Sequence, residues 1–151
     1  MQIVIRKASE SDIDAVCRIY DHILKEQERG NVSVGWVRDI YPTKATAESA
    51  LFRNDLFVEE ADGKIVGTAI INHIQPDTYN KVVWQYDADD KDIMVLHTLV
   101  IDPYSKGKGL GKIFVKFYEQ YSLEHNCNYL RIDTNELNVN ARAFYKKIKL
   151  S

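Results

Sequence analysis

Apolar residues recur along the chain at the spacings of helices and strands. The alternating segment Gln2 to Arg6 predicts a first strand, and apolar positions three and four apart then predict an amphipathic helix that ends at Gly30. The Ser-x-x-Asp patterns between Ser9 and Asp14 are typical of a helix start. Similar spacings predict three more helices, at about 43–52, from Leu110 onward and over 138–148. Strand patterns cover 56–60, 64–72, 93–101 and 129–133, and Asp62-Gly63 predicts a hairpin between the first two.

The order of these elements predicts one sheet with helices on its faces. Strands and helices follow one another as β-α-α-β-β-β-α-β-α, which suits an α+β or mixed α/β fold. Residues 93–101 are a nearly continuous apolar run, typical of a central strand covered on both faces. With 151 residues, the chain has the length of a single domain, residues 1–151.

Charge and composition narrow the classes of function. The chain has 20 basic and 22 acidic residues, a net charge of −2, so no basic field favours nucleic acid or a membrane surface. Cys17 and Cys127 lack the spacing of metal ligands, so we expect two reduced thiols and no metal site. No apolar run reaches the roughly 18–20 residues of a membrane span. We therefore expect a cytoplasmic protein without a nucleic-acid or membrane partner.

A turn rich in glycine and lysine carries the sharpest chemical signal. It reads Lys106-Gly107-Lys108-Gly109-Leu110-Gly111-Lys112 and lies between the apolar strand and the helix that follows it. Glycines allow a ligand to come close, a helix N-terminus offers unpaired N–H groups, and the lysines add positive charge. This combination predicts a phosphate or pyrophosphate site; a flexible, solvated loop is the alternative. Because Ile113 stands where a Walker loop needs a hydroxyl residue, that motif is excluded, and the glycine spacing argues against a dinucleotide fold.

Four segments, in order along nearly the whole chain, resemble the GNAT acetyltransferases, which transfer an acetyl group from acetyl-CoA to an amine. The glycine-rich turn is similar to the family's pyrophosphate loop, with Lys106 in place of the usual Gln or Arg. Residues 99–103 resemble its central strand, and Gly63-Lys-Ile-Val-Gly67 resembles its hairpin. The segment Asn138-x-x-Ala-x-x-Phe-Tyr145-x-Lys resembles its late helix. The resemblance implies a mixed, mostly antiparallel sheet with helices on both faces.

The resemblance also implies how acetyl-CoA binds. The pyrophosphate would lie on residues 106–112, and the pantetheine arm would lie between the central strand and the strand at 129–133. Backbone groups of Leu99, Val100 and Ile101 would bond the arm and the thioester carbonyl. Asn138 matches a residue that contacts coenzyme A, although it could instead cap a helix. Tyr145 would protonate the leaving thiolate; the alternative is a core aromatic residue.

Other residues are candidates for the acceptor side. His97 lies two residues before Leu99, which places both on one face of a regular strand, and imidazole titrates near neutral pH. It is therefore a candidate general base, or holder of the water that relays the proton; the alternative is a hydrogen-bonded core histidine, and His73 is a weaker candidate base. The aromatic residues Trp36, Tyr41 and Trp84 are candidates to wall an apolar acceptor cleft.

The C-terminal segment departs from the family pattern, because the chain ends at Ser151 without the usual closing strands. The strand at 129–133 would then be an open edge, which a second copy of the chain in a homodimer would cover; the alternative is that the C-terminus is a truncated or altered version of the family's. The sequence predicts an N-acetyltransferase that takes the acetyl group from acetyl-CoA. Its acceptor would be a primary amine of a small molecule or peptide, attacking directly in a ternary complex. A non-catalytic module that binds CoA or a nucleotide on the same fold is the alternative.

Overall fold

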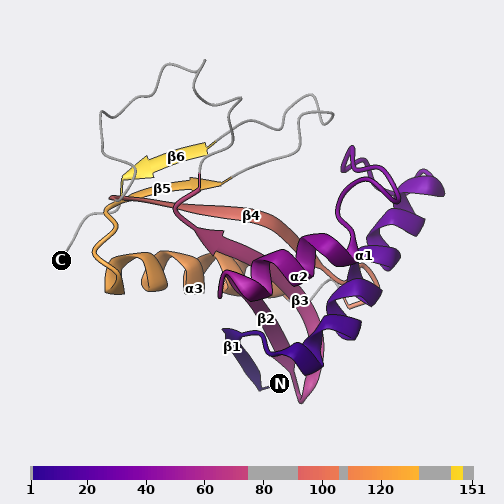
Figure 1. The fold of residues 1–151 in the computed structure, drawn as a ribbon, viewed down its shortest axis with the longest axis horizontal. Helices are drawn as coiled ribbons and strands as arrows, with labels where there is room; N and C mark the ends of the chain where they lie inside the picture. Colours follow the sequence, from indigo (N-terminus) through magenta and orange to yellow (C-terminus); the bar gives the residue numbers. More distant parts are fainter. Residues whose placement is uncertain (1, 75–91, 106–108, 133–143, 148–151) are drawn as a thin grey trace.

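Six strands form one sheet in the order β1-β2-β3-β4-β5-β6 (Figure 1). The structure is a computed structural model that describes residues 2–74, 92–105 and 109–132, and the backbone of 144–147. The strands are β1 (Ile3–Lys7), β2 (Leu56–Ala61), β3 (Lys64–Asn72), β4 (Ile93–Ile101), β5 (Tyr129–Ile132) and β6 (Phe144–Lys147). Neighbouring strands are antiparallel except for β4 and β5, which are parallel. This is the mixed, mostly antiparallel sheet that the sequence predicts.

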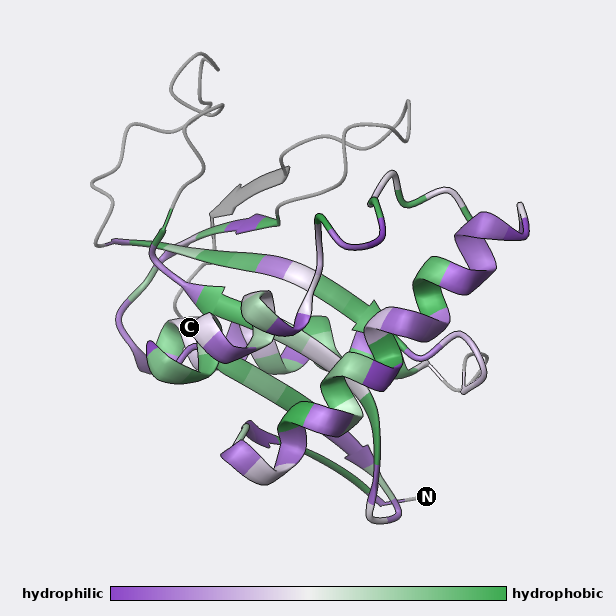
Figure 2. Cartoon of the chain, turned by 45° about the vertical axis from the view of Figure 1, so that its right-hand side comes forward, coloured by the Kyte–Doolittle hydropathy of each residue, from purple (hydrophilic) through white to green (hydrophobic). Residues whose placement is uncertain are grey.

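Helices cover both faces of the sheet. The helices are α1 (Ile13–Glu28), α2 (Lys44–Phe52) and α3 (Leu110–Glu124), with a 3-10 turn at Glu10–Asp12 before α1. One buried cluster joins α1 and α2 to the sheet, and a second joins α3 to its opposite face. Figure 2 shows the apolar stripes of the helices against the sheet and their polar sides turned outward. Within the described residues, no helix is long and apolar enough to cross a bilayer.

The predicted start and stop signals of α1 are confirmed. The Ser9 N–H donates to Asp12 Oδ2 at 2.8 Å, which is one half of the capping box read from the sequence, and this box begins the 3-10 turn that leads into α1. Gly30 follows the helix with a φ of 81°, a conformation that favours glycine. The hairpin between β2 and β3 is confirmed as well, because Asp62 and Gly63 both have positive φ, at 51° and 85°. Two such residues make the tight turn that the twist of a hairpin requires.

The prediction of a helix over 138–148 is wrong where the structure describes this segment. Residues 144–147 form β6, which pairs antiparallel with β5, so that Tyr145 lies opposite Arg131. Apolar residues spaced three and four apart suit a helix, but phenylalanine and tyrosine also favour strands, and pairing with a neighbouring edge decides between the two. The outer edge of β5 is therefore paired within the chain, which removes the reason for expecting a partner strand there. Residues 138–143 lie outside the described part.

A carboxyl group lies in the packed layer between the sheet and α3. Glu59 of β2 is fully buried, and neither of its side-chain oxygens has a hydrogen-bond partner among the described residues. It occupies the space above Gly67, where an added Cβ would lie 2.8 Å from Glu59 Oε1 and 2.9 Å from Ile101 Cδ1. Burial without a partner disfavours the charged form and raises the pKa of Glu59 to about 7.

Substituting glutamine for Glu59 is expected to change how stability depends on pH. The folded chain keeps a proton on Glu59 up to a pH of about 7, whereas the unfolded chain releases it near the ordinary glutamate pKa. The wild-type protein therefore loses stability as the pH rises between these two values, by about 2–3 kcal/mol in total. Glu59→Gln cannot ionise. The difference in unfolding free energy between the variant and the wild type should therefore grow in favour of the variant by that amount from pH 4.5 to pH 8, as measured by urea denaturation.

Glu124→Gln is the matched control, because Glu124 is exposed on α3. Its unfolding free energy should follow that of the wild type at both pH values. Parallel pH dependence of Glu59→Gln and wild type would mean that Glu59 ionises as an ordinary surface glutamate.

Candidate active site

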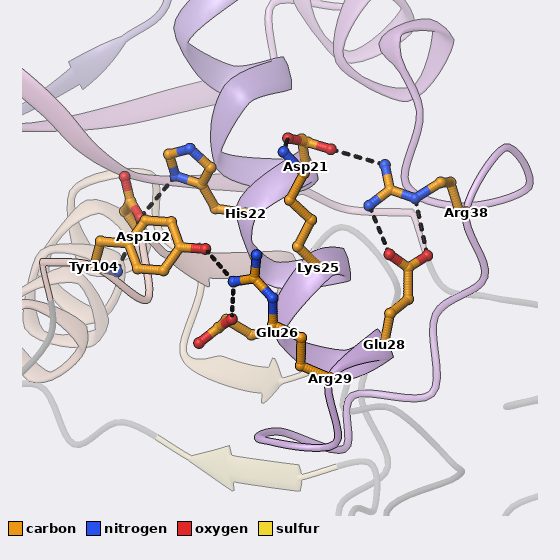
Figure 3. A network of polar contacts seen from close by, with 9 residues as sticks. All are labelled: Asp21, His22, Lys25, Glu26, Glu28, Arg29, Arg38, Asp102 and Tyr104. Carbon is orange, nitrogen blue, oxygen red and sulfur yellow. Dashed lines mark hydrogen bonds and ion pairs between the residues drawn. The ribbon is translucent and has the colours of Figure 1, made fainter.

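The turn that leads from β4 into the glycine-rich segment is fixed against α1 (Figure 3). Asp102 follows β4 and is buried, and its Oδ1 accepts from the Tyr104 N–H and from His22 Nδ1, both at 3.0 Å. The Asp102 N–H donates to the Val66 carbonyl at 2.7 Å, which ties the same turn to β3. The ring of Tyr104 lies against that of His22, with centroids 4.6 Å apart. These contacts fix the turn after β4 against both α1 and β3.

The start of α3 has the features of an anion site. Gly109 has a φ of 70°, and nothing lies within 4 Å of the position that a Cβ would occupy there. The first helical hydrogen bond runs from the Ile113 N–H to the Gly109 carbonyl at 3.1 Å, so helix geometry leaves the N–H groups of the preceding residues without a partner inside the helix. Leu110 is buried, so only its backbone can contact a ligand, whereas Lys112 is exposed. Lys106, Gly107 and Lys108 lie outside the described residues.

Strand β4 continues beyond the end of its ladder with β5. The parallel pairing covers Ile93–Leu96 against Tyr129–Ile132, while β4 runs on to Ile101. Among the described residues, the segment from Leu99 to Ile101 has a strand partner on one side only, which is β3. One edge of this segment, which includes Leu99, Val100 and Ile101, is therefore without a strand partner in the described part. Its N–H and C=O groups are available to an extended ligand.

Tyr118 of α3 holds the two parallel strands together where their ladder exists. Its hydroxyl is buried and lies 2.5 Å from the Met94 carbonyl of β4 and 2.8 Å from the Arg131 carbonyl of β5. The same oxygen accepts from the Arg131 N–H at 3.0 Å. A side chain from the helix thus bridges backbone groups of both strands next to the point where their pairing ends.

A β-bulge changes which side chains of β4 share a face. Thr68 pairs with Val100 and Ile70 pairs with His97, so β4 has one more residue than β3 in this interval. Thr98 within the bulge has a φ of 47°. As a result, Leu99 packs on the α3 face and His97 lies on the opposite face. The prediction that His97 and Leu99 share a face is therefore wrong, because the extra residue interrupts the alternation.

His97 opens into a cleft on the face that α1 and α2 cover. The cleft has a volume of about 380 Å³. Besides His97 and Asn72, the residues that line it are Tyr41, Thr46, Ser49, Arg53, Ile70 and Ile74. Ile70 and Ile74 contribute apolar surface to the lining, and Thr46 and Ser49 of α2 contribute hydroxyl groups. The Tyr41 hydroxyl is hydrogen-bonded to Thr98 Oγ1, so the cleft adjoins the bulge in β4.

A chain of hydrogen bonds fixes the imidazole of His97. Its Nε2 lies 2.8 Å from Asn72 Oδ1, and Asn72 Nδ2 donates to Asp55 Oδ2 at 3.1 Å. Asn72 Oδ1 also accepts from the Ile74 N–H at 2.9 Å, which settles the orientation of the amide. Because that oxygen only accepts, Nε2 of His97 carries the hydrogen, and the neutral ring has its basic lone pair on Nδ1. Arg53 Nε donates to the same Asp55 oxygen at 2.9 Å.

The structure brings together two of the three predicted aromatic wall residues. Trp36 and Tyr41 form an edge-to-face pair with ring centroids 6.2 Å apart, and Tyr41 lines the cleft. Gln27 of α1 holds their segment, since its side chain bonds the Trp36 carbonyl and accepts from the Gly35 N–H, both at 2.5 Å. Arg38 adds ion pairs to α1 (Figure 3). Trp84 lies outside the described residues.

The structure does not place the remaining candidate residues in this cleft. Asn138 lies outside the described residues, and Tyr145 is placed only by its backbone in β6. His73, the weaker candidate base, has its Nδ1 2.9 Å from the Ile93 carbonyl and does not line the cleft described above.

Sequence reasoning missed the residues that support His97. Asn72 closes one predicted strand, Asp55 precedes another and Arg53 follows a predicted helix, so no short motif joins them. The one available signal is position, because all three stand at the ends of elements, where polar side chains gather at the edge of a core.

Comparisons with known proteins agree with this architecture. The chain is 26% identical, over 97% of its length and 76% of the relative's, to an uncharacterized N-acetyltransferase of Methanocaldococcus jannaschii. A GNAT-family acetyltransferase from Streptococcus agalactiae has a similar structure, with a TM-score of 0.78 and 21% identity over 99% of this chain and 96% of that one. A Salmonella typhimurium protein assigned as an acetyltransferase and solved with its cofactor acetyl-CoA has a TM-score of 0.60 and 18% identity, over 91% of this chain and 72% of that one. The model of the acetyltransferase (GNAT) family matches residues 18–149, and the chain therefore belongs to that family.

Proposed function

We propose that this protein transfers the acetyl group of acetyl-CoA to a primary amine of a small molecule or peptide, by direct attack in a ternary complex. The observation that carries the proposal is the bulged end of β4, where Leu99, Val100 and Ile101 have a strand partner on one side only within the described part and a cleft lies next to the bulge. Family membership supports acetyl transfer, and the similar Salmonella typhimurium structure contains acetyl-CoA.

The described residues fit the donor. The pyrophosphate would accept from the N–H groups at the start of α3 that have no partner inside the helix, with Lys112 and the lysines at 106 and 108 adding charge. Gly109 leaves open space at that point. The pantetheine arm would lie along the edge of Leu99, Val100 and Ile101, where a backbone N–H directed at the thioester oxygen stabilises the charge of the tetrahedral intermediate.

His97 is the proposed general base. The amine nitrogen attacks the thioester carbon from the cleft, and His97 takes the amine proton through Nδ1, directly or through one water. The support is geometric: His97 lies in the cleft that adjoins the bulge, and its Nε2–H is fixed by Asn72.

Tyr145 is the proposed general acid, and Asn138 a proposed contact to coenzyme A. When the carbon–sulfur bond breaks, the phenol of Tyr145 would give its proton to the leaving thiolate. Both assignments depend on the matched motif, in which the two residues are seven positions apart.

The test of the proposal is release of free thiol from acetyl-CoA across a panel of primary amines, with mass spectrometry of the acetylated products. We expect thiol release that depends on the amine. Calorimetry with coenzyme A separates the alternative: binding of coenzyme A without acetylation of any amine would favour a non-catalytic binding module.

A further inference from the structure

Arg53 is held at the acceptor cleft by one of its nitrogens only. Its Nε donates to Asp55 Oδ2 at 2.9 Å, and its side chain is 41% exposed. The two terminal nitrogens have no hydrogen-bond partner among the described residues. A guanidinium in this position presents a fork of donors, which is the geometry that binds a carboxylate through two parallel hydrogen bonds.

Arg53 is also connected to the proposed base. The Asp55 oxygen that accepts from Arg53 accepts from Asn72 as well, and Asn72 in turn holds His97. Asp55 is largely buried, at 17% exposure of its side chain, so the position of the guanidinium is defined by the protein interior rather than by solvent. The cation and the imidazole therefore have a fixed relation to each other on one cleft.

The lining of the cleft favours an anion as the second group of the acceptor. Of the described residues that line it, Arg53 alone carries a full charge at every physiological pH. Thr46, Ser49 and Arg53 are spaced three and four residues apart, and so they present two hydroxyls and the guanidinium from one face of α2. No carboxylate lines the cleft within the described part, and the carboxylate behind it, Asp55, already accepts from Arg53 and Asn72, so the lining does not favour the second positive charge of a diamine.

We infer that the acceptor is an amine that also carries a carboxylate, such as an amino acid. Its amine lies at His97, its carboxylate is bound by the terminal nitrogens of Arg53, and its body packs on Ile70 and Ile74. This inference rests on the proposed acetyl transfer, and it adds the class of acceptor and the residue that selects it.

Matched acceptors test the inference. The twenty amino acids and a set of short carboxylic amines are compared with the corresponding carboxamides, in which the charge is removed and the amine kept. With the wild-type protein we expect kcat/KM for the best acid to exceed that for its carboxamide by about 10-fold or more, because a charge-assisted pair is replaced by a neutral contact.

The variant Arg53→Gln should lower kcat/KM for the acid by about 10-fold or more beyond any change in kcat/KM for the carboxamide, mainly through KM, because only the acid loses an ion pair. For Arg53→Lys, which keeps the charge without the fork, kcat/KM for the acid should lie between the values for the wild type and for Arg53→Gln. Arg18→Gln is the matched control, because Arg18 is exposed on α1 away from the cleft, and it should behave as the wild type. Calorimetry with coenzyme A should give the same affinity for all three variants.

The outcomes separate this inference from the proposed function. Equal rates with acids and carboxamides, or an Arg53→Gln variant that matches Arg18→Gln on every acid, would overturn the carboxylate specificity while acetyl transfer stands. If no amine of either set is acetylated by protein that binds coenzyme A, the proposed function fails and this inference fails with it.

Discussion

Replacing His97 with alanine is expected to lower kcat by about 100-fold, the effect of losing a positioned general base. The affinity for coenzyme A should not change, because His97 lies on the face of β4 opposite Leu99 and the start of α3. Steady-state kinetics at saturating acetyl-CoA measure the loss. The pH profile of kcat gives the second reading, since the limb on which activity rises with pH should disappear in the variant.

His125→Ala is the control for this experiment. His125 is exposed at the end of α3, so its loss should leave both kcat and the pH profile as they are. A His97→Ala variant that keeps the rising limb of the wild type would show that another group accepts the amine proton.

The second large effect is expected from Tyr145→Phe, which should lower kcat by about 100-fold at saturating acetyl-CoA. Phenylalanine keeps the ring but cannot protonate a leaving thiolate. A donor thioester whose thiol is more acidic needs no such proton, so the loss should shrink when it replaces acetyl-CoA. Rates for both donors, with wild type and variant, measure the difference.

Tyr121→Phe is the matched control, since it removes the hydroxyl from an aromatic residue of α3 that packs on Phe57 and Phe117. Its kcat should equal that of the wild type. Turnover of Tyr145→Phe at the wild-type rate would show that Tyr145 is not the general acid and that water protonates the leaving thiolate.

Most elements were predictable because their signals are local. The bounds of β4 agree with the apolar run at 93–101, and α3 begins at Leu110 as the pattern indicates. The hairpin turn at Asp62 and Gly63 follows from two residues that accept positive φ. Where burial, periodicity and turn chemistry all indicate the same secondary-structure element, a single sequence is enough to predict that element and its bounds.

The features that build the candidate site depend on contacts between distant segments. Threonine rarely adopts positive φ, so nothing in the sequence marks Thr98 as part of a bulge. Asn72 and Asp55 are 17 residues apart, and His97 is 25 residues from Asn72. At 144–147, the choice between helix and strand depends on the neighbouring edge of β5, which local spacing does not report.

The extra residue in β4 decides which face each later side chain of the strand occupies. If the strand were straightened with Thr98 retained, Leu99 and Ile101 would leave the α3 layer and Val100 would enter it. Loss of Thr98 itself would keep all three on their present faces, because His97 and Leu99 would then alternate as neighbours, and it would remove the hydrogen bond to the Tyr41 hydroxyl. The bulge therefore works as an offset that the second half of the strand needs as long as Thr98 is present.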